Sequence, residues 1–336
     1  MRGNEFFTHA RKYDHLELFT TKVDFEYFAQ SHTTDIICNP NDIFMATYYF
    51  TAQLAHFTIT SYPFIQRNFI YFIQDYEPIF FPHDSYHIEA LEGYRFPHFP
   101  IYSTIFLETW FREKKLGQYH FMGSVPDDRL FIAYPAIKIW PPLDVESLSN
   151  PKRIRTVVFY ARSHIYRNAY QLTMDSLSIA ICKGVFDDGN EWKFIGLGST
   201  SDYRTTLGSH CNRTTPVIIR KNVPEPEYLK IVRTGDIGYS LMLSPHPSLP
   251  PFDFAAAGLI AVTNSFETKT MKSFQNISTN FIIVEPYIET LVEGLRKAVK
   301  LSLDISYRQK GAENFNWERN WYGPSCYGSI LMERCV

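Results

Sequence analysis

The stretch 239-YSLMLSPHPSLPPFDFAAAGLIAVTNSF-266 decides the predicted fold. It begins with an apolar run, Tyr239–Leu243, and continues through the loop Ser244–Ser248 to an alanine-rich segment that two prolines open and a glycine ends. Proline suits the first position of a helix, alanine favours its interior, and glycine ends it in a left-handed turn. The next run, Leu259–Thr263, is apolar and β-branched enough for a buried strand. The predicted order is therefore strand, loop, short helix and strand.

The predicted helix start has the chemistry of an anion site. A helix N-terminus carries partial positive charge and unpaired N–H groups, so it can hold a phosphate. The loop in front of it would aim Ser244, His246 and Ser248 at the same ligand, and Asp253 in the first turn could accept hydrogen bonds from ribose hydroxyls. These features suit a nucleoside diphosphate. The alternative is that Asp253 only stabilises its own helix dipole and that the prolines only shape a loop.

The pattern Pro-x-Phe-Asp-Phe-Ala-Ala-Ala-Gly, followed by Ile-Ala-Val-Thr, resembles the donor-site signature of retaining-type GT-B glycosyltransferases. The fuller string Ser-Leu-Met-Leu-Ser-Pro-His-Pro-Ser-x-Pro-Pro resembles the rhamnan-synthesis rhamnosyltransferases, the WsaF-like group, and this likeness extends over about 39–283. The resemblance implies an α/β fold with two Rossmann-like doubly wound domains facing a cleft. One departure is that many GT-B enzymes carry a second acidic residue seven or eight positions before the helix carboxylate, where this chain has Pro245 and His246.

The length of 336 residues favours two domains. A polar, turn-rich linker near 141–153 separates a predicted acceptor-side domain, 1–145, from a predicted nucleotide-sugar-binding domain, 153–305. We expect the first domain to be shortened, because no strand with a Gly-rich turn opens the chain. The resemblance to GT-B enzymes implies that the segment 306–336 is a C-terminal helix that crosses back to the first domain.

Polar residues follow the predicted strand Asn68–Ile73 at once, as Gln74, Asp75 and Glu77. Open α/β sheets bind ligands at the carboxyl ends of their strands. The resemblance places this stretch at the interdomain cleft, so the three residues are candidates for a catalytic base or for groups that orient the acceptor. Each could instead only cap a loop.

Two arginines follow the predicted strand Arg155–Tyr160, namely Arg162 and Arg167. Guanidinium groups can bind pyrophosphate oxygens in a bidentate way. In GT-B enzymes an Arg, with a Lys some residues later, neutralises the leaving diphosphate at this strand exit. Arg162 matches directly and Arg167 replaces the usual Lys, while Lys221 is a weaker third cation near the nucleobase. The alternative is surface charge engaged in salt bridges.

Several other elements are predicted from local patterns. Asn39–Asp42 is a turn signal after a short strand, Asp35–Cys38, and a helix is expected over Ile43–Ala55. Pro135–Trp140 is expected to be a strand and Arg308–Tyr322 a helix. His83 and His87 have the i,i+4 spacing of metal sites, but they lack the His-Glu-x-x-His order, so Asp84 and Ser85 are expected to form a cap or loop and no metal is expected.

Composition excludes several classes of function. A net charge of −2 provides no electrostatic footprint for nucleic acid. No apolar run of about 18 residues and no signal-peptide pattern is present, so we expect no transmembrane segment. Five scattered cysteines without a CxxC pair indicate reduced thiols in the cytoplasm and argue against zinc.

The sequence therefore predicts a metal-independent glycosyltransferase without a cofactor. It would move a sugar, rhamnose by the narrower resemblance, from a nucleoside-diphosphate donor to a glycan acceptor, with fixed cations stabilising the leaving group. One alternative is a non-catalytic relic that binds nucleotide or sugar, which the short first half favours. Another is a nucleotide-sugar epimerase, because fold does not fix the reaction. The sequence does not define the oligomeric state.

Overall fold

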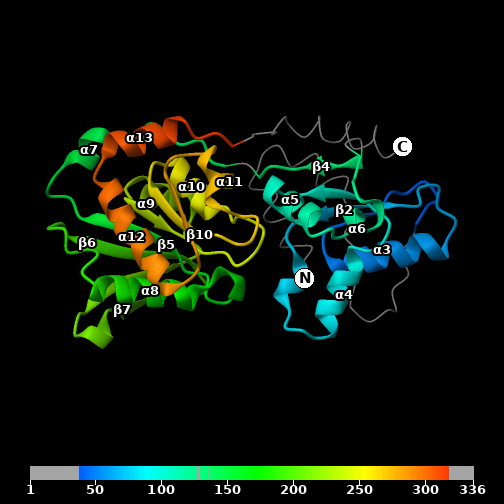
Figure 1. Ribbon diagram of the computed structural model, residues 1–336, viewed down its shortest axis with the longest axis horizontal. Helices are drawn as coiled ribbons and strands as arrows, with labels where there is room; N and C mark the ends of the chain where they lie inside the picture. The colour runs from blue at the N-terminus through cyan, green and yellow to red at the C-terminus, as the bar shows by residue number, and fades with distance from the viewer. Residues whose placement is uncertain (1–37, 127–128, 136, 318–336) are drawn as a thin grey trace. The chain divides into compact units, whose positions relative to one another are not determined.

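The computed structural model describes residues 38–126, 129–135 and 137–317. The chain divides into two compact units, 1–42 and 43–336. In the first unit, the described residues form the predicted turn, in which the N–H of Asp42 donates to the carbonyl of Asn39 at 3.0 Å. Everything described below belongs to the second unit (Figure 1).

The second unit contains two sheets in its described residues. The first sheet has the strand order β1-β2-β3-β4, and all of its pairs are parallel. Its strands are β1 (Met45–Ala46), β2 (Phe69–Ile73), β3 (His98–Tyr102) and β4 (Phe131–Ile132). The helical segments of this half are α3 (Tyr49–Ser61), η2 (Glu77–Phe80), α4 (Ser85–Gly93), α5 (Ile105–Glu113) and α6 (Gln118–Met122).

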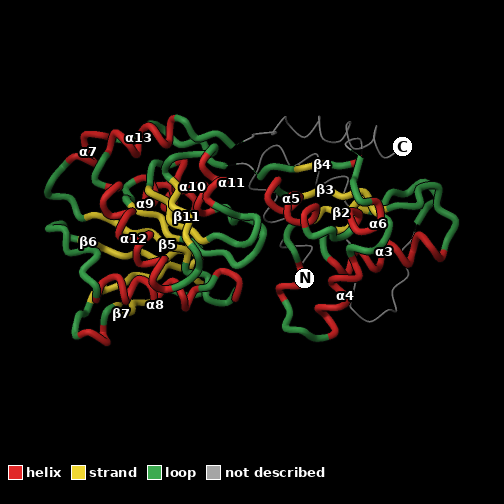
Figure 2. The backbone as a smooth tube through the Cα atoms, in the orientation of Figure 1, coloured by secondary structure: helices red, strands yellow, loops and turns green. Residues whose placement is uncertain are grey.

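The second sheet has the order β11-β10-β9-β5-β6-β8-β7, and only the edge strand β7 is antiparallel among these strands. Its strands are drawn in yellow in Figure 2. Its strands are β5 (Arg155–Tyr160), β6 (Trp192–Ser199), β7 (Tyr203–Leu207), β8 (Thr215–Lys221), β9 (Ile237–Tyr239), β10 (Ile260–Asn264) and β11 (Phe281–Val284). The helical segments of this half are α7 (Val145–Ser149), η4 (Tyr166–Asn168), α8 (Tyr170–Cys182), η5 (Ser209–Cys211), α9 (Glu225–Arg233), α10 (Pro250–Ala256), α11 (Met271–Gln275), α12 (Ile288–Ser302) and α13 (Ile305–Glu313).

The strand order reverses at β5. The chain first moves outward through β6 and β8, and then returns to place β9 on the other side of β5. The crevice at such a switch point, beyond the carboxyl ends of the strands, is where open α/β sheets bind ligands. The loops that follow β5 and β9 therefore meet at the predicted position of a ligand.

Packing on the second sheet follows the alternation of side chains along β5. Val157 and Phe159 point into a core shared with α8 and α12, whereas Val158 points into a core shared with α9, α10 and α11. Successive residues of a strand face opposite sides of the sheet. The sheet is thus covered on both faces, as its run of buried residues predicts (Figure 1).

The short helix α10 has the predicted local chemistry. Prolines occupy its first two positions, and Gly258 follows it with a φ of +84°. A Cβ at Gly258 would lie 2.5 Å from the end of the Leu143 side chain, which would have to shift, and the positive φ strains any residue other than glycine there. Gly238 in β9 similarly allows Phe254 of α10 to pack directly on the strand.

Some element predictions were wrong. The helix expected from Ile43 begins only at Tyr49, because residues 45–46 pair with β2 as the strand β1. No strand forms at 135 or 137–140. The C-terminal helix is α13, which begins at Ile305 and ends at Glu313. The predicted strand at 35–37 and the segment 318–336 lie outside the described residues.

The residues after α13 reach the first half of the unit. The indole N–H of Trp317 donates to the carbonyl of Pro135 at 2.9 Å. Its ring stacks on Phe106 of α5 with a centroid distance of 6.2 Å. Trp317 therefore connects the end of the chain's described part to α5.

Three further expectations concern membrane segments, the cysteines and the start of α4. Within the described ranges, no helix combines the length and the apolar character that crossing a bilayer requires. The expectation of reduced thiols was wrong for one pair, because Cys182 and Cys211 form a disulfide. The two cysteines are 29 positions apart in the sequence, so no local pattern reveals the pair.

At the predicted cap or loop of Asp84 and Ser85, the Asp84 carboxylate accepts the N–H of His87, so Asp84 caps the start of α4.

Candidate functional site

A cavity of about 350 Å³ lies where the polar end of β2 meets the loops after β5 and β9. Most of the predicted site residues line it. These are Gln74, Asp75, Glu77, Arg162, Arg167, His246 and Ser248. Residues from both sheets thus contribute to one cavity, as the positions of their strand ends predict.

Asp75 is the buried centre of this cavity's polar network. Its carboxylate accepts a short hydrogen bond from the Ser244 hydroxyl and a 2.8 Å hydrogen bond from the N–H of Tyr76. The other carboxylate oxygen lies 3.2 Å from Nε of Arg167 in an ion pair. Ser244 is therefore buried behind the residues that line the cavity. Asp75 orients Arg167, and because its carboxylate is already engaged it is not a free general base.

The two arginines are held differently. The guanidinium of Arg167 lies over the ring of Phe80, 4.2 Å from its centroid, in addition to its pairing with Asp75. Arg162 makes only longer contacts, from Nε to His164 Nε2 at 3.3 Å and from a terminal nitrogen to the Tyr160 hydroxyl at 3.5 Å. In the described part of the chain, no carboxylate lies within ion-pair distance of Arg162. Its charge is therefore available to an anionic ligand.

The loop after β9 is fixed through the main chain of Met242. Its N–H donates to Asn264 Oδ1 at 2.7 Å, and its carbonyl accepts from Asn264 Nδ2 at 3.2 Å and from Lys269 Nζ at 2.6 Å. The next N–H, that of Leu243, donates to the carbonyl of Arg167 at 2.7 Å. Asn264 and Lys269 are positioning residues that the sequence did not reveal, because their partner is a backbone group of another segment.

Lys269 is fully buried beneath this loop. Burial lowers the pKa of its ammonium to about 7, and the nearby Asp75 carboxylate partly opposes that shift. Near neutral pH this lysine therefore exchanges a proton more readily than an exposed one.

His246 is neutral at physiological pH. Burial lowers the pKa of its imidazole, although Asp75 acts in the opposite direction. Its Nδ1 accepts the N–H of Ser248 at 3.0 Å, so the proton of the neutral ring belongs on Nε2. Ser248 has a φ of +67°, a conformation that costs about 1 kcal/mol or more for a residue with a Cβ. This loop is therefore a strained turn that presents His246 as a hydrogen-bond donor.

Glu77 lines the cavity as an uncharged acid. It is buried, and its carboxyl accepts the N–H of Tyr49 at 2.6 Å and the Tyr71 hydroxyl at 3.4 Å. Burial raises the pKa of this carboxyl to about 8. Near neutral pH it is mostly protonated and does not serve as an unassisted general base.

The wild-type chain is expected to lose stability towards unfolding as the pH rises, because the buried Glu77 becomes charged. Replacing Glu77 by glutamine is expected to abolish this pH dependence. The folded-state pKa of about 8 lies above the ordinary value of 4.5, so the folded chain holds a proton that the unfolded chain releases. The resulting stabilisation is complete below pH ~4.5 and is lost as the pH rises to about 8. Through this group the free energy of unfolding should fall by up to about 5 kcal/mol, as measured by urea denaturation across that range.

Glu92 on α4 is an exposed glutamate that serves as the matched control. Glu92→Gln should keep the wild-type pH dependence of the unfolding free energy, whereas Glu77→Gln should flatten it. Identical pH dependence in wild type and Glu77→Gln would show that the Glu77 carboxyl is not protonated in the folded chain.

Asp253 and the start of α10 differ from expectation. Asp253 does not line the cavity, because its carboxylate accepts the Tyr228 hydroxyl at 3.0 Å and lies 3.5 Å from the N–H of Lys138. Burial raises the pKa of Asp253, and the Tyr228 hydrogen bond opposes that shift. The prolines at the start of α10 have no N–H, and the N–H groups of Phe252 and Asp253 both donate to the carbonyl of Leu249. The prediction of free amides at this helix start was therefore wrong.

A second, apolar cavity of about 190 Å³ adjoins the first and shares Tyr160 and Pro250 with it. Its other lining residues are Phe159, Leu197, Gly198, Asn222, Val223, Tyr228 and Phe254. Tyr228 lines this cavity and its hydroxyl donates to Asp253, so the Asp253 carboxylate lies behind Tyr228 and does not line the cavity itself. Lys221 lies outside both cavities, and its N–H donates to Asp202 at 2.8 Å. The sequence missed this cavity because its residues come from five separate segments.

The chain resembles solved structures in its fold. Sucrose-phosphate synthase from Thermosynechococcus elongatus is 11% identical, with a TM-score of 0.57 over 86% of this chain and 71% of that chain. An E. coli trehalose-6-phosphate structure with bound UDP-2-fluoro glucose is 14% identical, with a TM-score of 0.57 over 82% and 70%. WaaG, a glycosyltransferase involved in lipopolysaccharide biosynthesis, is 12% identical, with a TM-score of 0.54 over 78% and 74%. A comparison with curated proteins finds no match.

Family models assign both halves of the chain. The WsaF N-terminal domain matches residues 11–106, and the WsaF C-terminal domain matches residues 155–296. Together they cover well over half of the sequence, and the parallel α/β architecture agrees with that of the GT-B glycosyltransferases. The chain therefore belongs to the WsaF family and is a glycosyltransferase of the GT-B fold.

Proposed function

We propose that this glycosyltransferase uses a nucleoside-diphosphate sugar and binds the diphosphate between Arg162 and Arg167. The single observation that carries the proposal is the convergence of both guanidinium groups on one cavity at the switch point of the second sheet. Arg167 is already oriented by Asp75, and Arg162 has no carboxylate partner in the described residues. Such preorganised cations stabilise negative charge as it develops on a leaving group.

The adjoining apolar cavity suits the nucleobase. Its volume of about 190 Å³ and its contact with the first cavity at Tyr160 and Pro250 allow one ligand to extend through both. The ring of Tyr160 or Tyr228 can pack against a base, and Asn222 can hydrogen-bond to its edge. The Asp253 carboxylate lies behind Tyr228, so we propose that it positions Tyr228 and reaches a ribose only if that hydrogen bond breaks.

The acceptor would enter beside the residues that follow β2. Gln74 is exposed at the cavity and donates to the carbonyl of Thr47 at 3.2 Å, so its amide can exchange that bond for an acceptor hydroxyl. Asp75 and Glu77 are both occupied, the first by Ser244 and Arg167 and the second by Tyr49. We therefore assign them to positioning. Because neither is an unoccupied base, the departing diphosphate itself is the group that we propose takes up the acceptor proton.

The proposal also covers the transferred sugar, the metal requirement, the acceptor and the location. The proposal of rhamnose as the transferred sugar rests on the WsaF family alone. The proposal that transfer needs no metal rests on the two arginines, whose charges can balance the diphosphate. A glycan acceptor and a cytoplasmic location complete the proposal.

A thermal-shift screen against thymidine, uridine, guanosine and adenosine diphosphates tests the donor site. At a ligand concentration of about 100 Kd, binding adds about 2.7 kcal/mol to stability, which corresponds to a rise in Tm of roughly 5 to 10 °C. We expect one diphosphate to produce this shift in the wild type and a much smaller one in Arg162→Ala. Arg296→Ala, at a partly exposed arginine of α12, is the matched control and should respond like the wild type.

Transfer is then measured with nucleoside-diphosphate sugars of the nucleotide that binds. The rhamnose donor is compared with the glucose donor, and each reaction is run once with EDTA and once with added Mg²⁺. Release of diphosphate that depends on an acceptor and persists in EDTA supports the proposal. Binding without any sugar release would instead identify a non-catalytic relic, and donor interconversion without an acceptor would identify an epimerase. No shift with any of the four diphosphates would refute the donor site.

A further inference from the structure

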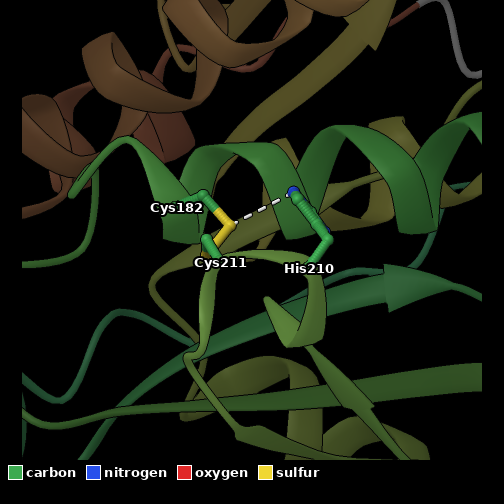
Figure 3. Close-up of side chains that lie close together, drawn as sticks. All are labelled: Cys182, His210 and Cys211. Carbon is green, nitrogen blue, oxygen red and sulfur yellow. Dashed lines mark hydrogen bonds between the residues drawn. A yellow bond between two sulfur atoms is a disulfide. The ribbon is translucent and has the colours of Figure 1, made fainter.

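Outside the donor site, a cysteine pair and a histidine lie together at the end of α8 (Figure 3). Cys182 is the last residue of α8, whereas His210 and Cys211 belong to η5. The disulfide joins the two segments with a Cα–Cα distance of 5.8 Å. The Nε2 atom of His210 lies 3.2 Å from the sulfur of Cys182. The fold thus brings the sulfur of Cys182 to the adjacent pair His210 and Cys211, although the two cysteines are 29 positions apart in the sequence.

These groups form the ligand set of a soft divalent cation. Their three ligand atoms lie within 4.8 Å of one another, and no other cluster of His, Cys, Asp or Glu in the described ranges does so. Thiolates and imidazole are the ligands that Zn²⁺ prefers. In a tetrahedral zinc site, the sulfur and nitrogen ligands stand about 3.6 Å apart, close to the separation between Cys182 and His210. The two sulfurs need only separate, which breaking the disulfide allows.

The orientation of His210 also suits a metal ligand. Its Nδ1 lies 3.4 Å from the hydroxyl of Ser178, which in turn accepts the N–H of Gly208 at 2.8 Å. A hydrogen bond at one ring nitrogen fixes the tautomer and aims the other nitrogen at a metal. With Nδ1–H directed at Ser178, Nε2 carries the lone pair that faces the sulfurs.

We propose that reduction of the Cys182–Cys211 disulfide converts this cluster into a zinc-binding site, with His210 as the third protein ligand and water as the fourth. A dithiol reductant supplies two electrons and two protons, and is itself oxidised to a disulfide, as the Cys182–Cys211 bond opens to two thiols. Zn²⁺ then displaces both thiol protons and leaves the imidazole neutral. The cysteines are partly exposed and His210 is exposed, so the cation reaches the site directly from solvent.

The site is separate from the donor cavity. Helix α8 has 13 residues and is therefore about 20 Å long, and Arg167 precedes its opposite end. The bound zinc takes no part in sugar transfer. It joins the end of α8 to η5, as the disulfide does in the oxidised chain.

The test compares zinc uptake before and after reduction of the full chain. The protein is reduced with a dithiol, freed of reductant without oxygen, dialysed against ZnCl₂ and analysed by elemental mass spectrometry. We expect about one Zn²⁺ per chain only after reduction. Substitution with Co²⁺ should also give the thiolate-to-cobalt absorption of a tetrahedral site.

Three variants and one control define the ligands. Cys182→Ser should lose zinc uptake, His210→Ala should weaken binding at least 100-fold, and Ser178→Ala should weaken it about 10-fold. Cys38→Ser is the matched control and should bind as the wild type does. Absence of zinc in the reduced wild type, or wild-type affinity in both Cys182→Ser and His210→Ala, would overturn the proposal.

Discussion

Replacing Arg162 by alanine is expected to lower kcat/KM for sugar transfer by about 100- to 1,000-fold, because one preorganised donor to the leaving diphosphate is lost. The expected change in Tm is small, since among the described residues the Arg162 side chain hydrogen-bonds only to Tyr160 and His164, at 3.5 and 3.3 Å. Steady-state kinetics with the donor, together with a thermal melt of each variant, measure the two quantities separately.

Two variants control this prediction. Arg162→Lys keeps the charge but not the bidentate geometry, so it should recover only part of the lost activity. Arg296→Ala removes a partly exposed arginine that pairs with Glu293 and should leave kcat/KM unchanged. Wild-type activity in Arg162→Ala would remove this arginine from the donor site.

Replacing Asp236 by alanine is expected to destabilise the chain by about 3–5 kcal/mol, because it leaves a buried arginine without its counter-ion. Asp236 and Arg308 are both fully buried, and Arg308 donates to Asp236 at 2.9 Å. The same arginine donates to the carbonyls of Gly258 and Gly235 at 2.7 Å each, and so joins α13 to the end of α10. Asp236 also pairs with Arg153. A thermal melt should show Tm lower by roughly 10 °C.

Asp187→Ala is the matched control for this ion pair. Asp187 also pairs with an arginine, Arg213, but both side chains are about half exposed. Water screens such exposed pairs, so they contribute little to stability and the melt of this variant should stay near that of the wild type. Equal effects of the two substitutions would contradict the importance of the buried pair.

The parts of the fold that the sequence predicts well are those where local chemistry and burial agree. The helix α10 and the strand β10 have proline at the helix start, alanine within it and a glycine with positive φ after it. The strand before them is displaced from the prediction of Tyr239–Leu243, because β9 spans Ile237–Tyr239 and residues 240–243 already belong to the loop. Strand β2 is a continuous apolar run and strand β5 contains one, 157–160, and both lie in parallel sheets. The convergence of their polar exits follows from parallel topology, so Asp75 and Arg162 could be predicted to share one cavity.

Besides β1, two strands were missed because their local patterns argue against a sheet. Strand β3 contains Pro100, which has no N–H, although the strand lies between β2 and β4. Strand β7 is a largely exposed edge strand with the sequence Tyr-Arg-Thr-Thr-Leu, which lacks an apolar face. In both cases pairing with neighbouring strands, rather than local propensity, decides the structure.

Site details that depend on distant partners could not be predicted either. Asp253 is engaged by Tyr228, which is 25 positions away, and its carboxylate also lies near Lys138, 115 positions away. Lys269 is fixed by a backbone carbonyl of another loop, and the Cys182 disulfide connects a helix end to η5. None of these contacts leaves a periodic or motif-like pattern in the sequence.

A crystal structure of the chain with its nucleoside diphosphate bound tests the donor site most directly. We predict phosphate oxygens about 2.7–2.9 Å from the guanidinium groups of both Arg162 and Arg167, with the base in the cavity beside Tyr228. A nucleotide bound elsewhere, or one whose phosphates contact neither arginine, would contradict the account.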